Sequence, residues 1–140
     1  MTAIPAWKRA QSDVQKALAL VTRKNFLWKT FTDTYAASGN IVQDQPSDFW
    51  VLDDGTFYVI EVKSCHQTKF YFKDVRPSQM IAARRVPAAG GVSIFLIVKL
   101  PENRWYKVLG TTMYNEKASG AVGMLWSQMK PITLDWELIK

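Results

Sequence analysis

The chain has 140 residues, of which 48% are hydrophobic and 21% charged, a balance typical of a globular domain rather than a disordered or fibrous protein. A formal charge of +6 favours an anionic partner, nucleic acid before a membrane surface. One cysteine and one histidine exclude an intramolecular disulfide, most zinc clusters and a Ser-His-Asp triad.

The first part of the chain predicts a helix, a strand and a hairpin. Residues 7–24 repeat apolar side chains at three-to-four spacing, which is typical of an amphipathic helix. The aromatic, threonine-rich segment 26–37 suits a strand, and a polar loop, 38–46, follows it. Asp54-Gly55, set between two apolar runs, is a strong signal for a hairpin turn.

The second part alternates helix and strand. Segment 76–86 predicts a helix that ends before Pro87, and 92–100 predicts a strand buried on both faces. A further strand is expected over 104–110. The tail is ambiguous, with a possible helix over 123–129 and a possible strand over 132–139. We therefore predict one α/β domain, residues 1–140, with a mixed central β-sheet flanked by helices.

The hairpin places charged side chains inside otherwise apolar strands. With a two-residue turn, the numbers of facing residues sum to 109, so Asp48 faces Glu61 with Cβ atoms ~4.5–5.5 Å apart. Lys63 lies two residues beyond Glu61 and shares its face. Trp50 is on that face too and is expected in the core. Because both faces of the hairpin are apolar, the sheet is expected to be covered on both sides.

Two partly buried carboxylates repel each other unless a positive charge lies between them. Lys63 neutralises one of them. A divalent cation held by Asp48, Glu61 and the backbone carbonyl of Val62 would neutralise both, and oxygen ligands of this kind suit magnesium or manganese. A plain ion pair at a strand end is the alternative. The geometry alone leaves both interpretations open.

A motif favours the metal site. "PSD", which ends at Asp48, is followed thirteen positions later (61 minus 48) by "EVK", Glu61 to Lys63. This pattern resembles the PD-(D/E)xK nuclease signature. The resemblance implies a restriction-endonuclease-like fold in which two acids hold magnesium. It also implies that the lysine orients the attacking water or helps to deprotonate it.

The similarity extends over about residues 8–108. "KRAQSDVQKAL" resembles the opening helix of the archaeal-type Holliday junction resolvases, with Asp13 in place of their metal-binding glutamate. "AASG" resembles their loop with a catalytic serine, which suggests Ser38. Residues 83–108 are similar to their later helix and strands, and 68–80 to the RecU resolvases. Asp33 competes with Asp13 as the first acid, and residues 111–140 are unassigned.

The resemblance implies a structure-selective endonuclease that resolves four-way DNA junctions with Mg²⁺, for which Mn²⁺ is expected to substitute. Its products carry a 5′-phosphate and a 3′-hydroxyl. Gln79 lies where many such nucleases hold the water, although an exposed helix residue is an equal alternative. Five basic residues follow the hairpin and are candidates for phosphate contacts: Lys69, Lys73, Arg76, Arg84 and Arg85.

Paired nicks in a two-fold symmetric junction need two active sites, so a homodimer is expected. Residues 26–37 and the Trp-rich tail are its candidate surfaces. No apolar run approaches the ~20 residues that span a bilayer, and no signal-peptide core is evident. We expect an intracellular, cytoplasmic protein (in the host, if the source is viral) with no membrane or small-molecule partner.

Two other functions remain open. Another PD-(D/E)xK nuclease, of the repair or restriction type, would use the same residues on a different substrate. A non-catalytic, basic DNA-binding module would carry the acids and lysine as a structural ion pair, and its DNA binding would not depend on metal.

Overall fold

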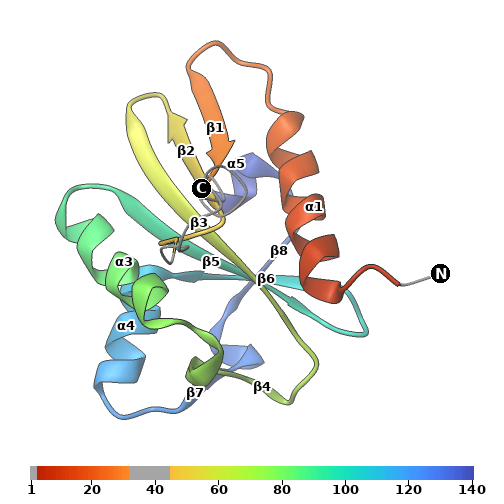
Figure 1. Cartoon of the computed structure of the whole chain (residues 1–140), viewed down its shortest axis with the longest axis vertical. Coiled ribbons are helices and arrows are strands. Elements are labelled where there is room, and N and C mark those ends of the chain that lie inside the picture. The colour runs from red at the N-terminus through yellow and green to blue at the C-terminus, as the bar shows by residue number, and fades with distance from the viewer. Residues whose placement is uncertain (1–2, 32–44) are drawn as a thin grey trace, which may run out of the picture.

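The computed structural model describes residues 3–31 and 45–140, in which a mixed six-stranded sheet carries helices on both faces (Figure 1). This arrangement confirms the predicted fold class. The sheet order is β1 (Phe26–Thr30), β2 (Phe49–Asp53), β3 (Thr56–Cys65), β5 (Val92–Lys99), β6 (Arg104–Leu109) and β8 (Lys130–Ile132). β3 and β5 pair in parallel and the other neighbours are antiparallel. A second sheet pairs β4 (Lys69–Tyr71) with β7 (Gly123–Leu125).

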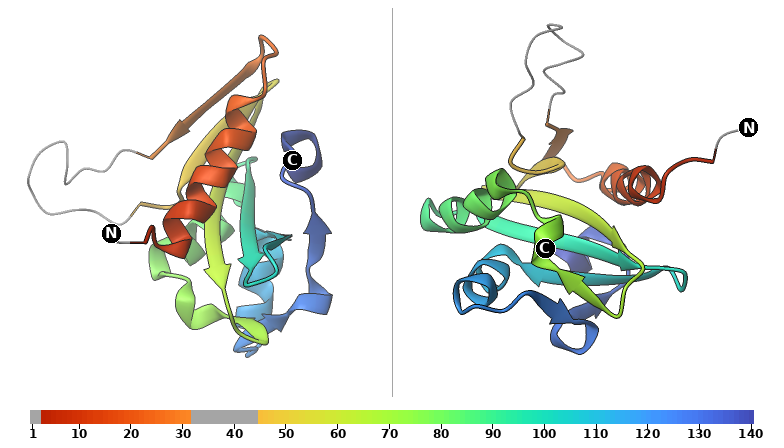
Figure 2. Two further views of the ribbon diagram at one scale, coloured as in Figure 1. Left: turned by 90° about the vertical axis from the view of Figure 1, so that its right-hand side faces the viewer. Right: turned by 60° about the horizontal axis from the view of Figure 1, so that its bottom comes forward.

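The helices divide between the two faces of the large sheet (Figure 2). The helical elements are α1 (Ala6–Ala19), η1 (Phe72–Asp74), α3 (Pro77–Ala88), α4 (Gly110–Ala118), η2 (Trp126–Gln128) and α5 (Trp136–Ile139). α1 and α5 enclose one apolar core against the sheet. α3, α4 and the β4–β7 pair enclose a second core on the opposite face. Within the described ranges, none of the helices has the length and apolar character needed to cross a membrane.

The hairpin has the predicted turn and register. Asp54 and Gly55 have φ angles of 49° and 87°, as a type I′ turn requires, and Phe49 pairs with Ile60. The expected coverage of both faces is wrong near the turn, where Phe57 is 41% exposed and Trp50 is half-buried and stacks on it. Among the described elements, α3 packs mainly over β5 rather than over the hairpin.

Two helices end at positions other than those expected. α1 stops at Ala19, and Arg23, which was predicted to be helical, reaches across to β2 instead. α3 runs through Pro87 to Ala88, so the prediction that it ends before the proline is wrong. In the last turn a proline removes just one backbone hydrogen bond. The helix is closed by a Schellman motif, in which Gly90 has a φ of 97° and the Gly91 N–H donates to the Val86 carbonyl at 2.9 Å.

The tail differs most from expectation. The predicted helix 123–129 is the strand β7 followed by η2, and most of the predicted strand 132–139 is a turn and α5. α4 was not predicted, because Gly and Thr at its start are weak helix formers. Gly110 is needed there, since a Cβ atom would lie 2.3 Å from Ser93 Oγ. The tail tryptophans fill the cores of their own chain, so their rings do not offer a dimer surface.

Candidate active site

The three residues of the predicted motif meet where β2 begins. Asp48 directly precedes β2, whereas Glu61 and Lys63 lie within β3. The Val62 N–H donates to Asp48 Oδ2 at 2.7 Å, which fixes Asp48 against β3. Lys63 Nζ lies 3.6 Å from Glu61 Oε1. The hairpin register therefore brings together two carboxyl groups and one ammonium, as the sequence predicts.

Glu61 is buried and Asp48 is half-buried, and the positive charges of Lys63 and Arg76 do not offset the cost of this burial. Glu61 is 4% exposed, and its Oε2 atom is buried with no hydrogen-bond partner among the described residues. Burial, and next the charge of Asp48, raise the pKa of Glu61 to about 8, although Lys63 opposes the shift. Burial also raises the pKa of Asp48, despite the hydrogen bond from Val62. A buried oxygen without a donor is costly, and a cation bound at the pair would remove that cost.

Gln79 belongs to this site rather than to an exposed helix surface. It is buried at the third position of α3, where its Nε2 donates to Glu61 Oε1 at 2.9 Å. Its Oε1 accepts the backbone N–H of Arg76 at 3.0 Å. The two contacts require opposite ends of the amide, so they fix its orientation. Arg76 lies at the start of the same helix, and its positive charge acts to lower the pKa of both Asp48 and Glu61.

The residue of α1 that contacts the acids is Gln11 and not Asp13. Gln11 Nε2 donates to Asp48 Oδ1 at 2.8 Å. Asp13 lines a surface pocket with Arg9, His66 and other residues. Two residues along a helix are separated by about 200°, so α1 cannot present both side chains in the same direction. Both flank the apolar stripe in the sequence, and the packing of α1 decides which one reaches Asp48.

The donor set suits a hard divalent cation held by two carboxylates. The Val62 N–H points toward Asp48, and a strand residue directs its carbonyl to the same side, so this carbonyl is a further ligand candidate. Across residues 3–31 and 45–140, no third His, Cys, Asp or Glu side chain joins the pair in metal-binding geometry. Asp13 is therefore not gathered with them. Ser38 and Asp33 lie outside the described residues.

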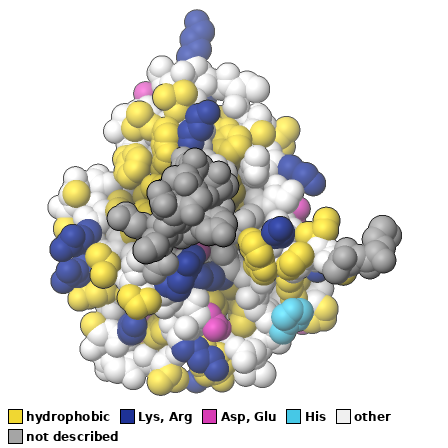
Figure 3. All heavy atoms as spheres, viewed as in Figure 1, with side chains coloured by type: hydrophobic (Ala, Val, Ile, Leu, Met, Phe, Trp, Pro, Cys, Tyr) yellow, Lys and Arg dark blue, Asp and Glu magenta, His cyan; other side chains and the backbone are white. Residues whose placement is uncertain are grey.

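The five predicted DNA-binding residues lie on the α3 side of the large sheet: Lys69 in β4, Lys73 in η1, Arg76 before α3, and Arg84 and Arg85 within it. Several stand over aromatic rings. Lys69 and Lys73 lie 5.2 and 5.5 Å from the Tyr71 centroid, and Arg84 lies 5.9 Å from that of Tyr114. Figure 3, seen from the side on which both α1 and α3 are visible, shows Lys and Arg side chains scattered among apolar ones.

Lys99, which the sequence did not single out, adds a further cation on this side. Its Nζ lies 5.7 Å from the Trp126 ring. Because Trp126 is buried, this side offers cations for phosphate contacts rather than a free ring for base stacking.

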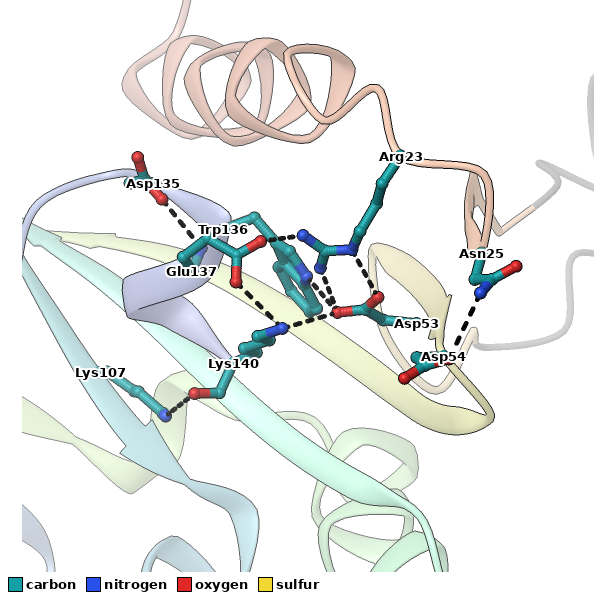
Figure 4. Close-up of polar contacts among 9 residues, drawn as sticks. All are labelled: Arg23, Asn25, Asp53, Asp54, Lys107, Asp135, Trp136, Glu137 and Lys140. Atoms are coloured by element: carbon teal, nitrogen blue, oxygen red, sulfur yellow. Dashed lines mark hydrogen bonds and ion pairs between the residues drawn. The ribbon is translucent and has the colours of Figure 1, made fainter.

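A second polar cluster is structural (Figure 4). Buried Asp53 accepts hydrogen bonds from Arg23 Nε at 3.0 Å, Trp136 Nε1 at 2.8 Å and Lys140 Nζ at 3.2 Å. Burial acts to raise the pKa of Asp53, but these donors, led by Arg23, outweigh it and hold the pKa at about 2. Glu137 pairs with both cations and completes the network. The cluster fastens α5 to the end of β2.

The fold has a known counterpart among solved structures. Hjc, a Holliday junction resolvase from the archaeal hyperthermophile Archaeoglobus fulgidus, superposes with a TM-score of 0.55. The match covers 89% of this chain and 93% of that chain, with 16% sequence identity. No family model and no curated protein matches the sequence. At this identity the similarity shows a shared fold.

Proposed function

We propose that this protein is a magnesium-dependent endonuclease that resolves four-way DNA junctions. One observation carries the proposal: Asp48, Glu61 and Lys63 converge around a buried oxygen of Glu61 that has no hydrogen-bond partner within residues 3–31 and 45–140. The similarity in fold to a Holliday junction resolvase supports the same function and favours a junction over linear duplex as the substrate.

Phosphodiester hydrolysis assigns a task to each residue. Asp48, Glu61 and the Val62 carbonyl would hold Mg²⁺, which lowers the pKa of water and stabilises charge on the phosphoryl oxygens. Lys63 would donate a hydrogen bond to the attacking water or to the scissile phosphate. The water oxygen bonds to phosphorus as the bond to the 3′ oxygen breaks. That oxygen takes up a proton, which leaves a 3′-hydroxyl and a 5′-phosphate.

The proposed partners follow from charge and symmetry. The Lys and Arg residues of the α3 side, beside Tyr71, Tyr114 and Trp126, would follow the phosphates of the junction arms. Two nicks in a two-fold symmetric junction require two sites, so the active form would be a homodimer.

The test is cleavage of a labelled four-way junction and of a matched linear duplex, with Mg²⁺ or with chelator. Symmetric nicks in the junction alone, lost with chelator and in Asp48→Asn, Glu61→Gln and Lys63→Ala, are expected. Lys63→Ala should lose about 10²–10⁴-fold in rate and keep junction binding. Equal cutting of both substrates would leave a nuclease without junction selectivity. Binding without cutting, with Mg²⁺ or Mn²⁺, would instead identify a DNA-binding module.

A further inference from the structure

Within residues 3–31 and 45–140, Gln11 is the side chain of α1 that donates a hydrogen bond to the acid pair. It lies one turn before Val14, which packs fully buried in the core beneath α1. Its position is therefore set by the same packing that fixes the helix on the sheet. The helix is anchored on both sides of Gln11, because Ala10 and Val14 are 3% and 0% exposed.

The amide completes the set of donors around Asp48. Oδ1 accepts from Gln11 at 2.8 Å and Oδ2 accepts from the Val62 N–H at 2.7 Å, so each oxygen has one neutral donor. Gln79 plays the equivalent part for Glu61 Oε1 from the other face of the sheet. Two glutamines, one from α1 and one from α3, thus fix the orientations of the two carboxylates. In the part of the chain that the structure describes, Glu61 Oε2 has no donor.

We infer that Gln11 is a positioning residue for cation binding, which holds Asp48 so that the acid pair presents its free lone pairs to one divalent cation. Its neutral amide takes the place beside Asp48 where a third carboxylate would create a stronger, more highly charged site. This inference rests on the proposed metal-dependent function. A partner of this kind, which orients a ligand without touching the metal, typically contributes 10–100-fold in metal affinity.

The experiment measures Mg²⁺ and Mn²⁺ binding to DNA-free protein by calorimetry, with the melting temperature recorded in chelator. Gln11→Met keeps the length of the side chain and removes the donor, so cation affinity should fall about 10-fold while the chelator melting temperature stays close to native. Gln11→Glu should tighten binding, since it adds a carboxylate beside Asp48. Gln15→Ala, exposed one turn further along α1, is the matched control and should bind as native.

Rescue separates positioning from a general structural effect. Excess Mg²⁺ should restore cleavage by Gln11→Met, because its defect is affinity, whereas Lys63→Ala should stay inactive at any concentration. Asp13→Asn should bind cations as native does. Weaker binding in Asp13→Asn together with native binding in Gln11→Met would overturn the inference and return the role to Asp13. If native protein binds no divalent cation, both the inference and the metal-dependent function fail; native binding by Gln11→Met removes the inference alone.

Discussion

Gln79 Nε2 lies 2.9 Å from Glu61 Oε1, so the helix that follows the acid pair also holds one of its carboxylates. The same amide caps the first turn of α3 by accepting the Arg76 N–H. One residue thereby couples the start of a helix to the candidate active site. Loss of the cap and loss of the contact to Glu61 have different consequences, which can be measured separately.

Replacing Gln79 with Met should lower both stability and activity. The Arg76 N–H and Glu61 Oε1 would each lose a partner, which costs about 1–3 kcal/mol and lowers the melting temperature by several degrees. Junction cleavage should fall about 10–100-fold, as is typical when a partner of a metal ligand is lost. Gln128→Met is the matched control, because Gln128 Oε1 makes the same cap contact to the Leu125 N–H, in η2. Equal loss of activity in both variants would contradict a specific role for Gln79.

The pKa of Glu61 predicts how stability depends on pH without divalent cations. This pKa is raised from 4.5 to about 8, so the folded state binds a proton that the unfolded state releases. The contribution of Glu61 is therefore fully present below about pH 4.5 and is lost as pH rises to about 8. We expect the free energy of unfolding in chelator to fall by at least about 1 kcal/mol over this range. Urea titrations at pH 5 and pH 8 measure it.

Glu61→Gln removes the titrating group and should flatten this pH dependence. Mg²⁺ should also stabilise native protein more at pH 8 than at pH 5, because cation and proton compete for the same carboxylates. A native profile as flat as that of Glu61→Gln would show that the acid pair is not strained in the absence of metal.

The Asp53 network should contribute to stability at neutral pH. Asp53→Asn replaces a buried carboxylate that accepts from Arg23, Trp136 and Lys140, and we expect a loss of about 2–4 kcal/mol. Because the folded pKa is lowered from 3.8 to about 2, the contribution is present above pH 3.8 and disappears as pH falls through 2. Chemical unfolding measures this contribution. The free energy of unfolding should differ between the native protein and Asp53→Asn at pH 7 but not near pH 2.

Asp54→Asn is the control for this experiment. Asp54 is exposed in the hairpin turn with a φ of 49°, and Asn-Gly suits a type I′ turn as well as Asp-Gly does. A stability loss in this variant similar to that in Asp53→Asn would trace the effect to the hairpin rather than to the network.

Salt dependence tests the proposed DNA surface. Each Lys or Arg that contacts a phosphate releases a counterion, so Arg84→Ala or Lys73→Ala should reduce the slope of log affinity against log salt by about 0.9. Lys16→Ala, exposed on the helix of the opposite face, should leave the slope unchanged. Titrations of fluorescent junction DNA over a range of salt concentrations measure the slopes. An effect of Lys16→Ala equal to that of Arg84→Ala would place the DNA elsewhere.

The structural features predicted correctly from the sequence were those set by short-range patterns. The Asp-Gly turn alone determines the register that sets Asp48 beside Glu61, and the continuous apolar run predicts the central strand β5. These features depend on neighbours within a few residues of one another, where turn geometry and side-chain alternation leave few choices. The trio at the site was therefore predictable without tertiary information.

Contacts between distant segments were not predictable. Gln11 and Asp13 both flank the apolar stripe of α1, so the sequence does not distinguish them. The rotation of α1 on the sheet brings Gln11 to Asp48. The secondary structure of the tail was predicted wrongly for a similar reason. α5 has four residues, and it forms because Trp136 fills a core and donates a hydrogen bond to Asp53. Intrinsic propensity over so few residues is weak compared with such packing.

The two outer strands of the large sheet differ in their exposure to intermolecular pairing. β8 has three residues, with Pro131 at its centre and Lys130 beside it, and a proline offers no N–H to a strand from another molecule. β1 has five residues without a proline, and Leu27 within it is 60% exposed. Of the two described edges, β1 is therefore where strand addition between partly unfolded molecules is expected to begin. Aggregation of the protein at high concentration would then begin at the β1 edge, which is distant in sequence from the acids Asp48 and Glu61.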